Sequence, residues 1–279
     1  MKRWILRGLI GLVVVVVFAA AGVFAASEFV IRHGPAKAPA PLRASVDAGS
    51  VARGKRIATL MGCHDCHGAD LTGRLFFDQM PIARMAGPNL SRLAPHQTDE
   101  DLNRAIRQGV AADGRPLWIM PSDAFARLND QETADLIAYI RTYPAKGEAQ
   151  PVKQIGMVGR LGALIGKFNA APKLIKAEGH LAPPDLGPRY AEGRSLARAC
   201  VECHGAELKG SAVTGAPDLA IAGAYDLADF EKLLRTGVAA GNRKLGLMSE
   251  SAPGRFNVLS HEEIAALHGY LRARAEKVS

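Results

Sequence analysis

The pattern of apolar and polar positions begins with one long apolar run near the N-terminus. Residues 8–26 are uncharged and rich in Val, Ala and Leu, and their number is close to what crosses a bilayer as a helix. Lys2, Arg3 and Arg7 precede the run, so the positive-inside rule places the N-terminus in the cytoplasm and the remaining chain outside. A cleaved signal peptide has a similar pattern, since residues 23–25 offer a small-residue cleavage site. In both interpretations the C-terminal bulk is exported.

After this run, helical periodicity and capping residues predict several helices in the first half of the chain. One helix is expected over roughly residues 48–62, with its apolar residues on one face. A second begins after Thr98, which is followed by acidic residues, and ends at Gly109 as a left-handed cap. Asn129 and Glu132 form a capping box for a third helix.

The same signals recur in the second half of the chain. Asp226 is expected to cap a helix that ends at Gly237, and Ser260 with Glu263 forms another capping box. Gly237 follows Gly109 by 128 residues, an offset that other landmarks share. The chain is therefore predicted to be a tandem repeat.

The expected organisation is all-α, with two helical domains after an N-terminal anchor. We expect a cytoplasmic tip and anchor over 1–33, a spacer over 34–46, domain 1 over 47–146, a linker over 147–188 and domain 2 over 189–279.

Three segments fall outside the repeat pattern. Residues 34–43 are rich in Pro and Ala, and we expect an extended spacer that lifts domain 1 off the membrane. Residues 155–165 are apolar with several glycines, and either pack between the domains, which we favour, or lie against the membrane surface. Residues 72–87 are an insertion, because the second half has no equivalent of their length.

The distribution of charge argues against nucleic-acid binding. The net charge is +8 and the pI about 9.5, but residues 1–43 alone carry +5 and residues 44–146 are balanced. The basic excess thus belongs to the anchor region rather than to a folded surface.

Two short motifs carry the candidate chemistry. Residues 63–67 (Cys-His-Asp-Cys-His) and 200–204 (Cys-Val-Glu-Cys-His) both read Cys-x-x-Cys-His, the signature of covalent haem attachment. Two thiols at this spacing share one face of a helical turn, and the adjacent His can bind the iron. A redox or zinc-binding Cys pair is the alternative, but two copies with His at the same place favour haem. All four cysteines are used, so no disulfide is proposed.

With these motifs, each half resembles a class I cytochrome c domain. In that family Gly-Pro-Asn-Leu, Gly-x-x-x-x-Gly, Met-Pro and a helix containing Tyr follow the haem motif. The first half supplies Gly87-Pro88-Asn89-Leu90, Gly109-Val110-Ala111-Ala112-Asp113-Gly114, Met120-Pro121 and Tyr139. The second half supplies Ala216-Pro217-Asp218-Leu219, Gly237-Val238-Ala239-Ala240-Gly241, Met248-Ser249 and Tyr270. The resemblance covers both halves but not the linker, and Ser249 departs from the usual Pro.

The whole chain resembles membrane-anchored dihaem cytochromes and, more loosely, the cytochrome subunits of periplasmic alcohol dehydrogenases. The resemblance implies thioether bonds from Cys63, Cys66, Cys200 and Cys203 to two haem c groups. It also favours retention of the N-terminal run as an anchor.

The resemblance also assigns the axial positions. His67 and His204 are the expected proximal iron ligands, and the carbonyl groups of Pro88 and Pro217 are expected to orient them. Tyr139 and Tyr270 are expected to pack helix against helix rather than to carry electrons.

Met120 and Met248 are the expected sixth ligands, because they share the 128-residue offset of the glycine caps. Both are expected in irregular stretches after a glycine, and the loop after Met248 is expected to be looser because it is longer. The rival candidates are Met80, Met85, His261 and His268, although His268 is expected to be a hydrogen-bonded core residue. Arg107 and Arg235 occupy equivalent positions, and either contact haem propionates or lie at solvated helix ends.

The function expected from these features is electron transfer. Thioether ligation from Met closes the iron to other ligands, which suits a carrier rather than an enzyme. We expect a dihaem cytochrome c, held by a single-pass anchor in a bacterial inner membrane with its haem domains in the periplasm. It would pass single electrons between a dehydrogenase or quinol-oxidising complex and an oxidase or soluble cytochrome. The alternatives are a haem enzyme of peroxidase or thiosulfate-oxidising type, and the cytochrome subunit of a membrane dehydrogenase complex.

Overall fold

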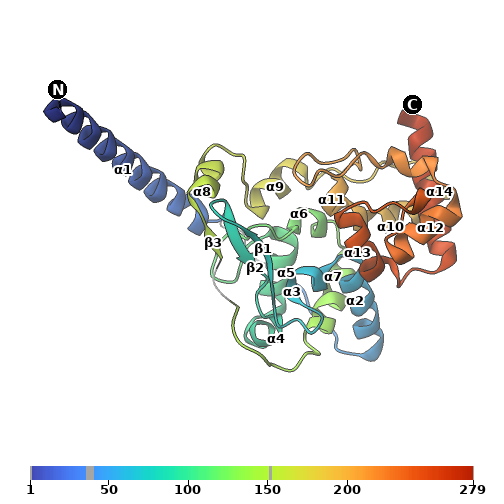
Figure 1. The fold of residues 1–279 in the computed structure, drawn as a ribbon. Helices are drawn as coiled ribbons and strands as arrows, with labels where there is room; N and C mark the ends of the chain where they lie inside the picture. Colours follow the sequence, from blue (N-terminus) through green and yellow to red (C-terminus); the bar gives the residue numbers. More distant parts are fainter. Residues whose placement is uncertain (1, 36–40, 151–152, 279) are drawn as a thin grey trace.

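The computed structural model describes residues 2–35, 41–150 and 153–278, and the protein is mainly helical (Figure 1). Helix α1 (Lys2–Arg32) extends away from the remaining elements. Within the described residues it is the one helix that is long and apolar enough to cross a membrane. None of the residues in its most apolar window is buried in the structure.

The other helices form two groups. The first group contains α2 (Ala48–Leu60), α3 (Cys63–His67), α4 (Leu90–Leu93), α5 (Asp99–Gln108), α6 (Ser122–Phe125) and α7 (Asp130–Ile140), with the 3-10 turn η1 (Ala94–His96). The second group contains α10 (Ala191–Leu196), α11 (Val201–His204), α12 (Leu227–Thr236), α13 (Leu247–Phe256) and α14 (His261–Val278), with the 3-10 turns η2 (Pro188–Tyr190), η3 (Ala197–Cys200), η4 (Leu219–Ala224) and η5 (Ala240–Asn242).

The predicted helix ends are confirmed. The Thr98 side chain accepts a hydrogen bond from the amide of Asp101 at the start of α5, and Gly109 ends that helix with φ 67°. Asp226 caps α12 in the same way, and Gly237 ends it with φ 70°. Because a left-handed conformation favours glycine, these caps fix where both helices stop.

In both groups the first and last helices cross at a glycine. A Cβ atom on Gly54 of α2 would lie 1.9 Å from the carbonyl oxygen of Asp135 on α7 and 2.8 Å from the Cβ of Tyr139. A Cβ atom on Gly193 of α10 would lie 2.2 Å from the carbonyl oxygen of Ala266 and 2.6 Å from the Cβ of Tyr270. The helices therefore touch backbone to backbone, and both tyrosines pack helix against helix as predicted.

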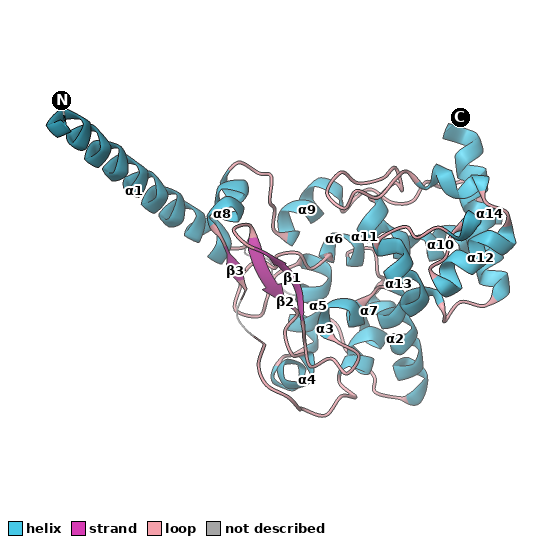
Figure 2. Cartoon of the chain, viewed as in Figure 1, coloured by secondary structure: helices cyan, strands magenta, loops and turns pink. Residues whose placement is uncertain are grey.

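The insertion over residues 72–87 forms a hairpin. Strands β1 (Leu75–Gln79) and β2 (Ala83–Ala86) pair antiparallel, and β3 (Gln154–Ile155) from the linker extends them to a three-stranded sheet in the order β1-β2-β3 (Figure 2). This small sheet is an addition to an otherwise helical fold, and the pattern of residues did not predict it.

The linker packs on domain 1. Helix α8 (Met157–Leu164) lies against α1, and α9 (Ala171–Glu178) lies against α6 and α5. A Cβ atom on Gly156 would lie 2.2 Å from the carbonyl oxygen of Pro81 at the hairpin turn. The expectation that residues 155–165 pack between the two domains was therefore wrong, because the inserted hairpin provides the surface that they cover.

The end of α1 is joined to domain 1 through α8. The Arg160 guanidinium donates to the Glu28 carboxylate at 2.7 Å and to the Ser27 hydroxyl at 3.0 Å. Ile31 is buried in a cluster with Met85 and Trp118 of domain 1.

The same junction corrects the expectation that the Pro/Ala spacer lifts domain 1 off the membrane. A Cβ atom on Gly34 would lie 2.8 Å from the carbonyl oxygen of Gly114, and Leu42 is buried in the main core. Both flanks of the spacer thus lie against domain 1. Residues 36–40, on which the expected extended conformation falls, lie outside the described residues.

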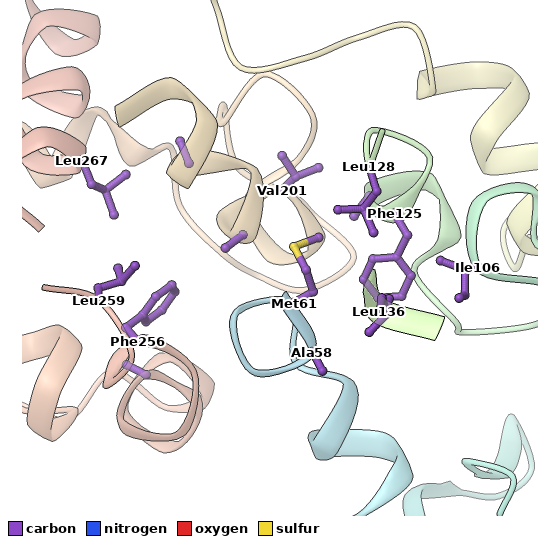
Figure 3. Packing of buried hydrophobic residues seen from close by; sticks show 14 of the residues in the cluster. Ala58, Met61, Ile106, Phe125, Leu128, Leu136, Val201, Phe256, Leu259 and Leu267 are labelled. Carbon is purple, nitrogen blue, oxygen red and sulfur yellow. The ribbon is translucent and has the colours of Figure 1, made fainter. Parts of the chain in front are cut away.

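One continuous apolar cluster joins the two domains. Met61 at the end of α2 and Val201 of α11 belong to the same set of buried side chains, and Figure 3 shows them in the middle of it. Two ion pairs flank this contact. Arg56 of α2 reaches Glu263 of α14 at 2.5 Å, and Arg198 of η3 reaches Glu132 of α7 at 2.5 Å.

These two pairs use equivalent acceptors. Glu132 and Glu263 are the carboxylates of the capping boxes that begin the last helix of each domain. Each therefore accepts hydrogen bonds from its own helix start and from an arginine of the other domain. Each domain therefore offers the same carboxylate of the repeat to an arginine of the other domain.

Replacing Gly54 or Gly193 with Ala should destabilise the affected domain by about 1–3 kcal/mol, because the added methyl group has no room between two backbones. Gly269→Ala is the matched control, since it lies next to Tyr270 and its Cβ would meet nothing within 4 Å. That change should leave stability unaltered or raise it slightly through helix propensity. Chemical denaturation of the three variants measures this, and equal effects at all three positions would contradict the crossing argument.

Candidate functional site: two haem-attachment motifs

The first motif occupies one turn of helix, α3, that is set at an angle to α2. Gly62 separates the two helices with φ 70°, a conformation that glycine adopts without strain. Cys63 therefore begins a new helical turn, and His67 ends it beside Gly68. The His67 ring is buried, and its Nδ1 donates to the carbonyl oxygen of Pro88 at 3.0 Å.

The second motif repeats this arrangement. Cys200 precedes α11, which ends with His204, and the buried His204 ring donates from Nδ1 to the carbonyl oxygen of Pro217 at 2.8 Å. The structure therefore brings together His67 with Pro88 and His204 with Pro217, the pairs that the resemblance implied. In both rings Nε2 is left for another partner, which is the arrangement a metal-binding imidazole needs.

A turn that follows each motif places the prolines. Leu71 and Leu208 are fully buried and have φ values of 58° and 63°, which is unusual for residues with a branched side chain. The Leu71 carbonyl accepts from the amide of Leu90 at 2.8 Å, and the Leu208 carbonyl accepts from that of Leu219 at 2.9 Å. Since Leu90 and Leu219 lie two residues after the prolines, these bonds hold the proline carbonyls over the imidazoles.

Sequence reasoning did not single out these two leucines. A signal was present, because they lie 137 residues apart, as Cys63 and Cys200 do. Their left-handed conformation has no sequence signature, however, since leucine rarely adopts it.

Burial sets the protonation state of the motif side chains. Desolvation is the main cause that lowers the pKa of His67 and of His204, against the raising effect of the proline carbonyls. Both imidazoles are therefore neutral near pH 7, as a metal ligand must be. Burial raises the pKa of the Cys63 and Cys200 thiols to about 12.

The placement of the cysteines bears on the alternative interpretations. All four are partly buried, with Cys63 and Cys200 packed against the main apolar cluster. Two cysteines on one face of a turn, next to an imidazole oriented by a proline carbonyl, suit thioether attachment of haem.

The two expected methionine ligands differ in local structure. Met120 lies in an irregular segment after Ile119, whose φ of 63° is strained for a β-branched side chain. Met248 lies in the first turn of α13, so the expectation of an irregular stretch was wrong for this residue. Both side chains are half-buried and, like Cys63 and Cys200, pack against the main cluster.

The extra residues after Met248 form helix rather than a loose loop. Helix α13 has 10 residues, whereas α6 at the corresponding place in domain 1 has four. Helix α13 packs against α12 and against α2 of the other domain, which explains why the longer segment is ordered.

The rival ligand candidates occupy other environments. Met80 is 54% exposed at the hairpin turn, and Met85 is buried in the cluster that contains Trp118. His261 is at the surface, with its Nδ1 2.7 Å from Glu231. His268 is buried, and its Nε2 donates to the carbonyl oxygen of Tyr225 at 2.9 Å, as expected of a hydrogen-bonded core histidine.

Arg107 and Arg235 are both engaged by the protein. Arg107 pairs with Asp130 at the start of α7. Arg235 donates to the carbonyl oxygen of Leu259 at 2.9 Å and pairs with Glu231. Arg107 thus ties α5 to the start of α7, and Arg235 ties α12 to the segment before α14. A contact with haem propionates stays a prediction.

Comparison with known proteins identifies the repeated unit. The model of the cytochrome c family matches residues 51–144 and again residues 190–275. The chain belongs to the cytochrome c family. This cytochrome therefore transfers electrons and, as a family member, carries covalently bound haem c.

Two curated relatives match most of the chain. The fructose dehydrogenase cytochrome subunit of Gluconobacter japonicus is 27% identical over 265 residues, which cover 84% of this chain and 54% of that protein. A dihaem c-type cytochrome of Cereibacter sphaeroides is 28% identical over 214 residues, which cover 70% of this chain and 67% of that protein. The chain thus spans about half the length of the fructose dehydrogenase subunit.

If Met120 and Met248 are the sixth ligands as expected, Met120→Ala and Met248→Ala should each remove the methionine–iron charge-transfer band of one haem and open that iron to carbon monoxide. Absorption spectra of the oxidised protein and of the reduced protein with carbon monoxide measure both effects. Met80→Ala is the matched control and should change neither spectrum, since Met80 is exposed at a hairpin turn. If Met120→Ala behaves like this control, Met85 becomes the candidate ligand in domain 1.

Proposed function

We propose that this cytochrome carries two haems and passes single electrons between a dehydrogenase or quinol-oxidising complex and a terminal oxidase or soluble cytochrome. The observation that carries the proposal is the repetition of one complete site. Each domain has its own Cys pair, a buried neutral imidazole, and a proline carbonyl that orients the imidazole at 3.0 Å or 2.8 Å. The dihaem relative supports the same count.

In this proposal Cys63, Cys66, Cys200 and Cys203 hold the haems by thioether bonds. His67 and Met120 bind one iron, and His204 and Met248 bind the other. The haem supplies an iron that gains and loses one electron at a potential within the biological range. The chain fixes the ligand rings, excludes water with the apolar cluster, and keeps both axial positions closed.

A haem count and a carbon monoxide test examine this proposal in the purified full-length protein. We expect two haems per chain that stay with the polypeptide in acid–acetone, and a reduced spectrum that carbon monoxide leaves unchanged. One haem per chain would contradict the dihaem carrier. A second haem that binds carbon monoxide in the unmodified protein would indicate an open site, and with it an enzyme of peroxidase or thiosulfate-oxidising type.

A role as the cytochrome subunit of a dehydrogenase complex is the second candidate, and the Gluconobacter relative favours it. The chemistry of the chain would be the same, but a stable partner would be present. Affinity purification of the tagged protein from solubilised membranes distinguishes the two: a subunit brings a dehydrogenase with it in fixed proportion, whereas a free carrier is purified alone.

We also propose that the cytochrome is held in the inner membrane by α1, with both domains in the periplasm. The apolar run and its basic flank support this orientation. Helix α8 supports it further, because it lies against α1 and exposes the apolar side chains of Met157, Val158 and Leu161. Domain 1 would then rest on the lipid surface through α8.

Spin labels on the full-length protein in lipid nanodiscs test this placement. A label at position 14 in α1 should lie in the acyl region, one at position 158 on α8 should lie at the lipid interface, and one at position 213 in domain 2, where Val213 is 96% exposed, should lie in water. Collision with oxygen and with a water-soluble relaxant reports these depths. A label at position 14 that is in water would remove the anchor, and one at position 158 that is fully in water would remove only the contact of α8.

A further inference from the structure

A single arginine joins the two haem-attachment motifs. Arg255 lies near the end of α13 in domain 2 and is 8% exposed. Its Nε donates to the Asp65 carboxylate at 2.7 Å, and its Nη1 donates to the Glu202 carboxylate at 2.7 Å. Asp65 lies between Cys63 and Cys66, and Glu202 lies between Cys200 and Cys203. The guanidinium therefore bridges the two peptide segments to which the haems attach.

The local structure is built to admit this side chain. A Cβ atom on Gly62 would lie 2.2 Å from the Cζ and the Nη2 of Arg255. The glycine that turns the chain into the first motif thus also provides the space in which the guanidinium lies. A planar guanidinium presents five donors in a fixed fork, so it can bind two carboxylates in different directions from one buried position.

We propose that Arg255 clamps the two haem-attachment motifs together and so positions the two haems for exchange of one electron within the chain. The inference rests on the proposed dihaem carrier. In the exchange one iron passes from the ferrous to the ferric state while the other passes from ferric to ferrous, and no bond or proton moves. The rate of such a step falls steeply with the distance between the two centres, so a contact that holds the attachment sites together controls it.

The clamp also places charge beside both centres. Burial of the guanidinium opposes its charge, but the carboxylates of Glu202 and Asp65 outweigh that effect, and the pKa of Arg255 is raised. A permanent positive charge favours the reduced form of a nearby iron, and each carboxylate favours the oxidised form. Loss of the arginine and loss of a carboxylate should therefore shift the potentials in opposite directions.

Other ion pairs between the domains provide a matched control. Arg56 pairs with Glu263 across the same domain contact, and neither residue lies in a haem motif. Arg56→Gln therefore removes a domain–domain ion pair without touching the bridge. Any effect that is specific to the motifs should appear in Arg255→Gln and not in Arg56→Gln.

The experiment measures redistribution of one electron between the haems after pulse reduction, together with both midpoint potentials, in the full-length haem-loaded protein. Arg255→Gln should slow the redistribution by about tenfold or more, the order of loss that a small misplacement of reacting centres produces. It should also lower both potentials. Arg255→Lys should keep the charge and hence the potentials, but still slow the exchange, because an ammonium group does not span both carboxylates.

Asp65→Asn and Glu202→Gln provide an independent test that keeps the arginine, in case its loss prevents folding. Each should raise the potential of the haem in its own domain. The clamp would be overturned if electron exchange in the Arg255 variants were no slower than in Arg56→Gln, whether or not Arg56→Gln is itself slowed. These outcomes are separate from failure of the proposed function, which the haem count and the carbon monoxide test report on the unmodified protein.

Discussion

The hydrogen bond from a buried imidazole to a proline carbonyl is the interaction on which the rest of this structure depends. It fixes the ring plane and engages Nδ1, so Nε2 is the nitrogen that would bind an iron. The carbonyl must therefore be held in place by something other than the histidine. The strained Leu71 and Leu208 turns do this, because each carbonyl holds the amide two residues beyond the proline. One leucine per domain thus adopts an unusual backbone conformation to fix one hydrogen bond.

Apart from this hydrogen bond, the two domains share one structural frame, and each domain adds a different segment to it. The frame is the crossing of first and last helices at Gly54 and Gly193, where no side chain separates the backbones. Domain 1 adds the hairpin between its motif and the residues that orient His67, and the linker then covers that hairpin. Domain 2 adds helix α13, which reaches across to α2. The additions determine how domain 1 contacts α1, whereas the contact between the domains uses both α13 and the helices of the frame, through Arg56 with Glu263 and Arg198 with Glu132.

The parts that could be predicted from the sequence are those encoded over a few residues. Capping boxes at Asn129 and Ser260, left-handed glycines at Gly109 and Gly237, and the two Cys-x-x-Cys-His motifs all depend on neighbours within one helical turn. The hairpin was missed because its strands are short and one of its partners, β3, comes from about 70 residues later in the chain. The helix at Met248 was missed for a related reason. Its order depends on packing against α12 and α2, which no local pattern encodes. Arg255 likewise had no signal, since its two acceptors lie 190 and 53 residues away.

The arginine that bridges the two haem-attachment motifs comes from domain 2 alone, and this affects how such a chain can evolve. A gene duplication yields two identical halves, and identical halves can exchange places without loss. Here Arg255 comes from the second half and reaches into the first, whereas Arg127, which lies 128 residues earlier, donates to the carbonyl groups of Leu181 and Glu178 in the linker instead. The order of the halves has therefore become part of the molecule, and the modules can no longer be shuffled as equivalent units.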